Sequence, residues 1–513
     1  MRAIVAAAMA AALLAASGCA IDERGTDPPG STLDATIRDQ DGDGTLERGP
    51  GEPLVDRTEL APKGRATRQV VRLGQLSDLH VRDEESPARV PFLDRLGDPV
   101  TSTFRPQEAL SPQVLTAALR AINTERPDAV LLTGDLLDSA QANELHQLLD
   151  VVEGGPVDPG SGRRAYDGVQ SASNPDGLFY RPALDAPRSP RLLERAETPF
   201  FSPGVRAPWL PVIGNHDVLV QGELPPSRAT DAIATGDRAL LTFDPALRDL
   251  VDRLPAGDRA RGADGTDGAS ASPDLRGVPR SAIEALLAEG VPGDVTTVPA
   301  DPERRHLRSA ELVARLREAA GVPAADPPTG GLDYVRDVGT LVRLVILDTA
   351  DRAGGAQGRV TARQTAFLRR ALRTAGDRAV VVVDHHGLAR SRGSDAALNL
   401  LAGDPDVVAE VTGDTHRNEI RPVRTRAGGY WRITTASLAD WPQQGRMLRL
   451  VTGAGGARAI ETWMVDQTGG AGGRDLAGNA RALSFIDAQG GRPNGDAGRR
   501  TDRNVRLWLP PRS

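Results

Sequence analysis

Short apolar runs of strand length, each ended by a cluster of polar residues, dominate the pattern of this chain. The clearest is Ala129-Val130-Leu131-Leu132-Thr133, which stops abruptly at Gly134-Asp135. A strand that is buried on both faces has a continuous apolar run of this kind. Because ligands bind at the carboxyl ends of strands in open α/β sheets, we predict that Asp135 lies at a functional sheet edge.

Four further apolar runs end in residue types that bind metals. They lead into Ser77-Asp78-Leu79-His80, Gly214-Asn215-His216-Asp217, Asp384-His385-His386 and Gly413-Asp414-Thr415-His416. Five of the seven His residues of the chain fall at these strand ends, an enrichment that loop capping alone does not explain. Carboxylate, amide and imidazole groups are ligands that suit Zn, Mn or Fe. The sequence therefore predicts one metal site assembled from several strand ends.

Helical periodicity alternates with these strands, which predicts an α/β fold. Ser111-Pro112 has the pattern of an N-cap followed by Pro in the first helical turn, and this helix should end before Pro127. The strand that follows would complete a parallel, right-handed strand–helix–strand unit. Further helices are expected at 281–289, 308–319 and 361–374, and further strands at 341–347, 379–383, 431–434 and 504–509. We expect a sheet of at least seven strands.

The N-terminus has the pattern of an export signal. Arg2 precedes an apolar run that is too short to span a membrane comfortably, so residues 1–18 are predicted to be a signal peptide. The run ends in Ala16-Ser17-Gly18-Cys19, which resembles the lipobox of bacterial lipoproteins; the alternative is an ordinary cleaved signal peptide with an incidental Cys. We expect an exported protein whose lipidated Cys19 anchors it to the membrane of the cell envelope, on the periplasmic or extracellular face.

The rest of the chain divides into a tether, a large domain and an extension. Residues 19–68 are polar and rich in Gly and Pro, and are predicted to form a flexible tether. Residues 69–468 contain all five strand-end clusters, and within them 219–331 is expected to be an insertion, either a lid over a substrate pocket or a surface elaboration. Residues 469–513 are predicted to be a C-terminal extension.

Composition narrows the class of partner. With 62 Lys and Arg against 69 Asp and Glu, the formal net charge is −7, so no nucleic acid is expected as the main partner. The acidic stretch from Asp39 to Thr45 mimics the start of a calcium-binding loop, but Pro50 occupies the position that needs a bidentate Glu. We interpret the stretch as a solvated turn, with weak calcium binding as the alternative.

Taken together, the five clusters resemble the sequence blocks of the calcineurin-like metallophosphoesterase superfamily. Those blocks are Asp-x-His, Gly-Asp-x-x-Asp, Gly-Asn-His-Asp/Glu, a strand-end His and Gly-His-x-His, and they occur here in that order over about 340 residues. Two further runs, Phe104–Leu110 and Asp440–Gln444, are similar to those of a bacterial subgroup known mainly from genome sequences. The resemblance implies a four-layer α/β/β/α sandwich with long loop insertions. It also implies hydrolysis of phosphomonoesters or phosphodiesters, by in-line attack of a bridging hydroxide held between two metal ions.

The resemblance also implies a role for each residue of the clusters. The residues expected to bind the first metal ion are Asp78, His80, Asp135 and His416. Those expected to bind the second are Asp135, Asn215, His385 and Asp414. Asp135 would thus bridge two divalent or mixed-valence ions of Fe, Mn or Zn, and His216 would stabilise the phosphoryl group or protonate the leaving oxygen. The residues expected to orient these groups through hydrogen bonds are Asp138, Asp217 and His386.

Position 414 departs from the family pattern. The family has a His where this chain has Asp414, and a carboxylate there adds negative charge and should lower the Lewis acidity of the second ion. Two functions therefore remain. The first is a hydrolase of small phosphoesters, and the second is an exported lipoprotein with a degenerate metallophosphoesterase fold that acts as a binding or scaffold module.

Overall fold

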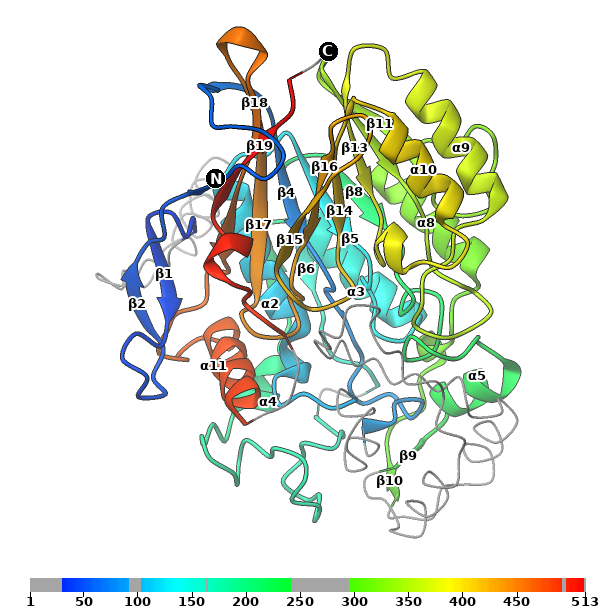
Figure 1. Ribbon diagram of the computed structural model, residues 1–513. Coiled ribbons are helices and arrows are strands. Elements are labelled where there is room, and N and C mark those ends of the chain that lie inside the picture. The colour runs from blue at the N-terminus through cyan, green and yellow to red at the C-terminus, as the bar shows by residue number, and fades with distance from the viewer. Residues whose placement is uncertain (1–29, 92–102, 163–164, 241–294, 491–494, 512–513) are drawn as a thin grey trace, which may run out of the picture.

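Two large β-sheets form the centre of the computed structural model, which describes residues 30–91, 103–162, 165–240, 295–490 and 495–511 (Figure 1). One sheet has seven strands, in the order β3-β19-β18-β17-β4-β5-β8. Their bounds are β3 (Val55–Arg57), β4 (Arg68–Leu76), β5 (Ala129–Thr133), β8 (Trp209–Val212), β17 (Gln444–Thr452), β18 (Arg458–Asp466) and β19 (Val505–Leu509). Strands β4, β5 and β8 are parallel, whereas β17 pairs antiparallel with β4.

The other sheet has six strands, in the order β11-β12-β13-β14-β16-β15. Their bounds are β11 (Tyr334–Val338), β12 (Val342–Ile346), β13 (Ala379–Val383), β14 (Val407–Thr412), β15 (Glu419–Val423) and β16 (Tyr430–Thr434). The four central strands are parallel, and β11 and β15 pair antiparallel at the two edges. Every residue of β5, β13 and β14 is buried, which is why these strands appear in the sequence as continuous apolar runs.

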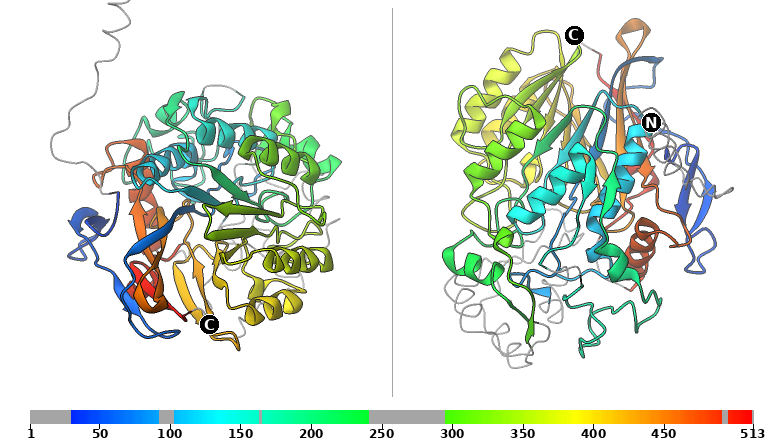
Figure 2. Two further views of the ribbon diagram at one scale, coloured as in Figure 1. Left: turned by 90° about the horizontal axis from the view of Figure 1, so that it is seen from above. Right: turned by 180° about the vertical axis from the view of Figure 1, so that it is seen from behind.

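Helices cover the outer faces of both sheets, so the molecule has four layers (Figure 2). Helices α2 (Ser111–Thr124) and α3 (Ala142–Glu153) lie on the seven-stranded sheet, and α9 (Ala362–Arg373) and α10 (Asp395–Gly403) lie on the six-stranded sheet. The other α-helices among the described residues are α4 (Leu192–Ala196), α5 (Arg228–Ala234), α8 (Ser309–Ala320) and α11 (Leu476–Gln489). Single 3₁₀ turns are η2 (Glu108–Leu110), η4 (Pro302–Arg304), η5 (Leu388–Arg390), η6 (Ala454–Gly456) and η7 (Arg500–Asp502). The predicted α/β/β/α sandwich is confirmed.

The inner faces of the two sheets pack against each other as an apolar core. Val71 of β4 and Leu448 of β17 face Val381 of β13 across this interface. The next residue along β13, Val382, points outward and packs with Phe367 of α9. Side chains along a strand alternate between its two faces, so one apolar strand packs against the other sheet on one face and against a helix on the other. The strand ends are therefore held between two buried interfaces.

The strand–helix–strand unit predicted at the centre is confirmed as parallel, because β4 and β5 pair in parallel with α2 between them. One detail differs, since Leu110 rather than Ser111 occupies the N-cap position of α2. Ser111 is the first helical residue, and its Oγ accepts a hydrogen bond from the Arg82 backbone N–H at 3.3 Å. Helices α8 and α9 confirm the predictions at 308–319 and 361–374, whereas 281–289 lies outside the described residues.

The prediction of a flexible tether is wrong for residues 30–68. Strands β1 (Ala35–Arg38) and β2 (Glu47–Pro50) form a hairpin, and β3 pairs in parallel with β19. The carboxylate of Glu52 lies 2.5 Å from the guanidinium of Arg503. The partners of β3 and of Glu52 are more than 400 residues away in sequence, so the polar local composition gave no sign of them. The predicted signal peptide and Cys19 lie outside the described residues.

The predicted C-terminal extension is also built into the fold. Strand β19 lies between β18 and β3 within the seven-stranded sheet, and α11 contacts α2. Four of the five residues of β19 are buried. Strand β19 is therefore an integral part of the sheet, and the strand predicted at 504–509 is confirmed.

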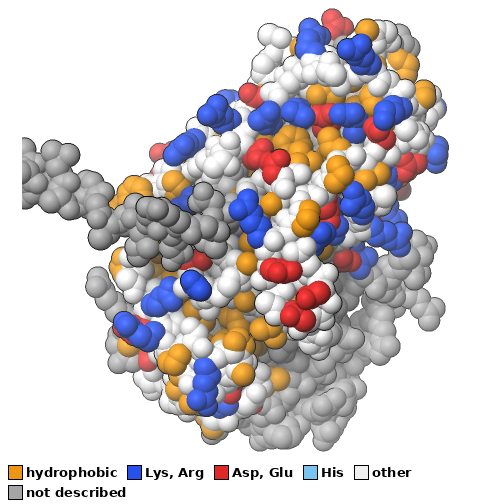
Figure 3. All heavy atoms as spheres, turned by 90° about the vertical axis from the view of Figure 1, so that its left-hand side faces the viewer, with side chains coloured by type: hydrophobic (Ala, Val, Ile, Leu, Met, Phe, Trp, Pro, Cys, Tyr) orange, Lys and Arg blue, Asp and Glu red, His pale blue; other side chains and the backbone are white. Residues whose placement is uncertain are grey.

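The predicted insertion at 219–331 is described in two parts, 219–240 and 295–331. They contain α5, α8 and a two-stranded sheet of β9 (Arg238–Leu240) and β10 (Val295–Thr297), and a second small sheet pairs β6 (Gly155–Val157) with β7 (Phe200–Ser202). Over the described ranges, every helix is too short or too polar to cross a membrane. On the face shown in Figure 3, basic and acidic side chains are interspersed with apolar ones.

Candidate metal centre

The predicted ligands follow five strand ends that meet at one edge of the two sheets. Asp78 and His80 follow β4, Asp135 follows β5, Asn215 follows β8, His385 follows β13, and Asp414 and His416 follow β14. Five of these residues have left-handed backbone φ values, of 50° at Asp78, 43° at His80, 47° at Asp135, 68° at Asp414 and 52° at His416. Such a conformation costs a non-Gly residue about 1–3 kcal/mol, and such residues cluster at active sites. The backbone here is bent sharply to turn these side chains inward.

Two glycines of the motifs allow this close packing. Gly134 has a φ of +90°, and a Cβ built there would lie 2.3 Å from Nδ1 of His385. A Cβ at Gly413 would lie 2.0 Å from Oγ of Ser77. The Gly in each Gly-Asp block is therefore required by the loop of a different strand packed against it.

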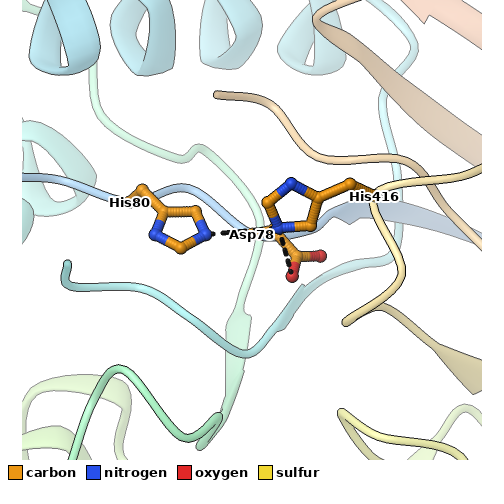
Figure 4. Close-up of side chains that lie close together, drawn as sticks. All are labelled: Asp78, His80 and His416. Atoms are coloured by element: carbon orange, nitrogen blue, oxygen red, sulfur yellow. Dashed lines mark hydrogen bonds and ion pairs between the residues drawn. The ribbon is translucent and has the colours of Figure 1, made fainter. Parts of the chain in front are cut away.

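Three imidazoles present the same nitrogen, Nε2, to the centre. The Nδ1 atom of each ring lies against a hydrogen-bond acceptor. Nδ1 of His80 is 3.0 Å from Asp138, Nδ1 of His385 is 2.8 Å from Thr133 O, and Nδ1 of His416 is 2.5 Å from Asp440. An acceptor at Nδ1 fixes the proton on that atom and leaves the Nε2 lone pair free for a metal. The Nε2 atoms of His80 and His416 lie 3.3 Å apart (Figure 4).

Two carboxylates lie between the imidazoles. Oδ2 of Asp135 lies 3.3 Å from Nε2 of His385 and 3.8 Å from Nε2 of His80. Figure 4 shows the carboxylate of Asp78 beside the ring of His416. Oδ1 of Asp78 lies 3.4 Å from Nε2 of His416 and 3.9 Å from Nε2 of His385. Both carboxylates therefore span the two predicted sites, so the bridging role assigned to Asp135 stays a prediction and Asp78 is an equally placed alternative.

Asp414, one of the remaining predicted ligands, lies beside His385. Nε2 of His385 is 3.9 Å from Oδ1 of Asp414, whose other oxygen lies 3.5 Å from the guanidinium of Arg390. Asn215 donates its amide N–H to Gly222 O, which leaves its buried Oδ1 without a hydrogen bond among the described residues. His386 bonds Thr349 Oγ1 through Nδ1 and belongs, with His385 and Asp414, to a group compact enough to hold an ion.

The donor set fits metal ions. Asp78, His80 and His416 form one compact group, and Asp78, Asp135 and His385 form another. The buried Oδ1 of Asn215 and Nε2 of His385 lack hydrogen-bond partners among the described residues. A buried polar atom without a partner is costly, and a cation would satisfy both atoms. The oxygens and imidazole nitrogens suit Zn, Mn or Fe.

The charges of the buried side chains also favour bound cations. Burial lowers the pKa of His80 to about 4 despite the nearby Asp138, so its imidazole is neutral and able to bind a metal at neutral pH. At His416 burial is outweighed by Asp440 and Asp78, which raise the pKa to about 9. Burial is likewise outweighed at His385, where Asp135 raises the pKa well above its usual range. The carboxylates thus attract positive charge to the centre.

The predicted accessory residues surround this centre. His216 donates its backbone N–H to Oδ1 of Asp135 at 2.9 Å, and its ring packs edge-on against His80. Its Nδ1 is 2.6 Å from Asp138 O. Asp217 accepts the backbone N–H groups of Leu137 and Gly214, both at 2.8 Å. The loops after β5 and β8 are thereby joined through side chains of the predicted blocks.

Arginines near the centre were not predicted as site residues. Arg82 lies 2.9 Å from Oδ1 of Asp138, and Arg105 lies 2.6 Å from Oδ1 of Asp440. Arg390, at the end of η5, is 57% exposed and pairs with Asp414. Arg105 and Asp440 fall in the two runs that resemble a bacterial subgroup, and this resemblance was the one signal that could have indicated them.

Comparisons with known proteins give distant likenesses. No protein-family model matches this sequence, and no curated protein matches it. A dimetal phosphatase from Danio rerio is similar in structure, with a TM-score of 0.36, 12% identity, and coverage of 78% of this chain and 97% of that one. PhoD has a TM-score of 0.31 and 12% identity over 86% of this chain and 81% of its own. Purple acid phosphatase PPD1 of yellow lupin, Lupinus luteus, has a TM-score of 0.30 and 12% identity over 82% of this chain and 54% of its own. The resemblance to the calcineurin-like metallophosphoesterases is confirmed in the arrangement of the two sheets and in the meeting of the five blocks.

Proposed function

We propose that this chain is a metal-dependent phosphoester hydrolase with a binuclear metal centre. One observation carries the proposal. Three imidazole Nε2 atoms and the carboxylates of Asp78 and Asp135, supplied by strand ends far apart in sequence, meet within hydrogen-bonding or ion-pairing distance of one another. A structural core would gain nothing from burying so many polar groups together, because their desolvation is unfavourable without a cation.

The predicted ligand sets remain the assignment that fits best. The first ion would be held by Asp78, His80, Asp135 and His416. The second would be held by Asp135, Asn215, His385 and Asp414. A pair of Fe, Mn or Zn ions, when bound, supplies Lewis acidity and an activated water for hydrolysis of a phosphoester.

His216 is the residue best placed to act on the substrate. Its Nδ1 lies 2.6 Å from Asp138 O, and its ring packs edge-on against the predicted ligand His80, so the imidazole lies beside the first metal site, where it could act on a phosphoryl or leaving-group oxygen. A Cβ at position 222 would lie 2.4 Å from Nε2 of His216, so a glycine there is needed for the ring to keep this position. The backbone bond from His216 to Asp135 couples its position to that of the shared carboxylate.

Asp138 and Asp217 act by holding other groups. Asp138 bonds Nδ1 of His80 and is itself bound by Arg82. Burial and the nearby Asp135 raise the pKa of Asp217 to about 8. At neutral pH its carboxyl group is thus largely protonated, and its two acceptor contacts tie the loop after β8 to the loop after β5. These residues keep the centre in shape without meeting the substrate.

We also propose where the enzyme works. Its signal peptide and lipidated Cys19 would place it on the membrane of the cell envelope, facing the periplasm or the exterior. The substrate would be a small phosphoester, because the acidic net charge of −7 disfavours polyanionic nucleic acid. Expression with Cys19→Ser should release the protein into the soluble fraction of the same compartment.

The second candidate, a scaffold with a degenerate site, is favoured by one contact. Asp414 already has Arg390 as a cationic neighbour at 3.5 Å, and this pair reduces the charge that position 414 offers to a second ion. A protein of this kind would bind one metal ion or none and would not turn over phosphoesters.

Metal analysis and a substrate panel separate the candidates. The purified protein should contain two metal ions per chain and hydrolyse chromogenic phosphoesters with Mn, Zn or Fe. His216→Ala should keep both ions and lose about 10²–10⁴-fold in turnover, the usual contribution of a group that transfers a proton. Asp135→Asn should lose metal as well as activity. One bound metal ion or none, without hydrolysis of any mono- or diester, would favour the scaffold. Two bound ions without hydrolysis would contradict both candidates.

A further inference from the structure

We propose that Asp440, clamped by Arg105, is a positioning residue that holds His416 and makes the first metal site the tighter of the two. The inference rests on the proposed function, because it takes His416 as a metal ligand. It draws on two sequence runs, 104–110 and 440–444, that contribute no predicted ligand.

The contacts form a continuous chain from Arg105 of the first run, through Asp440 of the second, to His416 at the centre. Arg105 donates from Nε to Oδ1 of Asp440 at 2.6 Å and from Nη2 to Oδ2 at 3.1 Å. Oδ2 of Asp440 also accepts the Nδ1 proton of His416 at 2.5 Å. Asp440 is 1% exposed and Arg105 is 6% exposed. A two-pronged, buried guanidinium–carboxylate pair has one orientation, so the carboxylate can hold the imidazole in one orientation too.

The clamp is itself anchored by the rest of both runs. The backbone N–H of Arg105 donates to Oε2 of Glu108, and Nε2 of Gln107 donates to Ala439 O at 2.9 Å. The carboxylate of Asp440 therefore has one position between the guanidinium of Arg105 and Nδ1 of His416.

The same arrangement stands behind the other imidazole of the first site. Oδ1 of Asp138 is shared by Nδ1 of His80 at 3.0 Å and by Nη2 of Arg82 at 2.9 Å. His385, in the second site, is instead held by a neutral carbonyl, Thr133 O. A carboxylate partner raises the basicity of a metal-binding His more than a carbonyl does. The first site has two imidazoles with carboxylate partners, and the second site has none. We therefore expect the first site to bind its metal ion more tightly and to fill before the second.

Metal titration of the full chain tests this asymmetry. Protein stripped of metal with a chelator is titrated with Zn²⁺, and binding is followed by competition with a chromophoric chelator. The wild type should show two classes of site. Asp440→Asn keeps the shape of the side chain but loses the charge, and it should weaken the tighter class about 10–100-fold and leave the weaker class within about twofold. Arg105→Gln, which frees the carboxylate to turn, should weaken the same class by less.

Asp466→Asn is the matched control. Asp466 is another aspartate with 1% exposure, and its carboxylate accepts from Gln444 and from the Ile37 backbone, away from the imidazoles. This variant should leave both classes of site unchanged.

The protonation of the two ring nitrogens of His416 is a second measurement. A general loss of protein stability would not change it. In ¹⁵N NMR spectra of the metal-free protein, recorded at a pH high enough to make the ring of His416 neutral, its one remaining proton should be on Nδ1 in the wild type and should lose that preference in Asp440→Asn.

The possible results distinguish a failure of the positioning role of Asp440 from a failure of the proposed function. An unchanged tight class in both Asp440→Asn and Arg105→Gln, with loss of that class in His416→Ala, would overturn the positioning role and leave the metal centre intact. Weakening of both classes to the same extent would overturn the asymmetry. If the wild type bound no Zn²⁺, the proposed function itself would fail. If Asp440→Asn did not fold, Arg105→Gln and the NMR tautomer of His416 would decide the matter.

Discussion

Asp414 is a candidate ligand whose carboxylate already has a cationic neighbour. Arg390 lies 3.5 Å away and is more than half exposed, so this pair is screened by solvent and weak. Burial raises the pKa of Asp414, with Arg390 and His385 opposing the effect. The sequence showed that position 414 lacks the family's His, but it could not show that an arginine from η5 reaches it. That contact depends on the loops after β13 and β14 meeting in space.

We expect Asp414→His to raise the occupancy of the second site and the rate of phosphoester hydrolysis. A neutral imidazole removes one negative charge and restores the Lewis acidity of the ion beside it. Metal content by mass spectrometry and turnover of a chromogenic phosphoester, each against Asp414→Asn, would check this. Asp414→Asn removes the charge without adding an imidazole, so it isolates the effect of charge. Equal metal content and equal turnover in Asp414→His and the wild type would show that the carboxylate serves as well.

The loops between strands and helices determine how the ligands meet. The strand ends were recognised from sequence because buried parallel strands leave continuous apolar runs, as β5, β13 and β14 do. The residue types after those runs then indicated a metal site. By contrast, the second sheet was expected only from the family resemblance, and the pairing of β3 with β19 was not predicted, because strand partners far apart in sequence leave no local pattern. The Arg105–Asp440 clamp was missed for the same reason.

We expect Gly134→Ala to disrupt the metal centre, although Gly134 itself supplies no metal ligand. The substitution places Cβ 2.3 Å from Nδ1 of His385 and also strains a φ of +90°. Gly330→Ala is the control, because its φ is +95° and its Cβ would meet nothing within 4 Å. Gly330→Ala should cost about 1–2 kcal/mol, the backbone strain alone, whereas Gly134→Ala should cost more and should also lose metal. Denaturant unfolding would measure the free energy of unfolding, and metal analysis would measure the bound metal. Equal losses of both in the two variants would show that His385 moves aside at little cost.

Buried acids give the whole molecule a pH-dependent stability. Glu85 and Glu197 are 3% and 5% exposed, and each has a carboxylate oxygen without a hydrogen bond among the described residues. Burial, with neighbouring acidic groups adding to it, raises both pKa values from 4.5 to about 9. Both groups are thus protonated in the folded protein at neutral pH but ionised in the unfolded chain.

Stability should therefore fall as pH rises. A group with a raised pKa contributes fully below its unfolded pKa of 4.5, and that contribution is lost as pH climbs through the folded value of about 9. Glu197→Gln cannot ionise, so its thermal midpoint should decline less than that of the wild type between pH 6 and pH 9. Glu194→Gln, on the same helix but exposed, should follow the wild type. Parallel decline in all three proteins would mean that Glu197 is ionised in the fold.

Strand β3 has one further consequence, which concerns the order of events during synthesis. Val55 pairs with Val505, and Arg57 with Leu507, so the edge of the seven-stranded sheet joins two segments that leave the ribosome far apart in time. Until the later segment emerges, β18 lacks its outer neighbour and β3 has nothing beside it. A chain that begins to fold before residues 505–509 are available would thus expose the unpaired edge of β18, and an edge of this kind invites pairing with another chain.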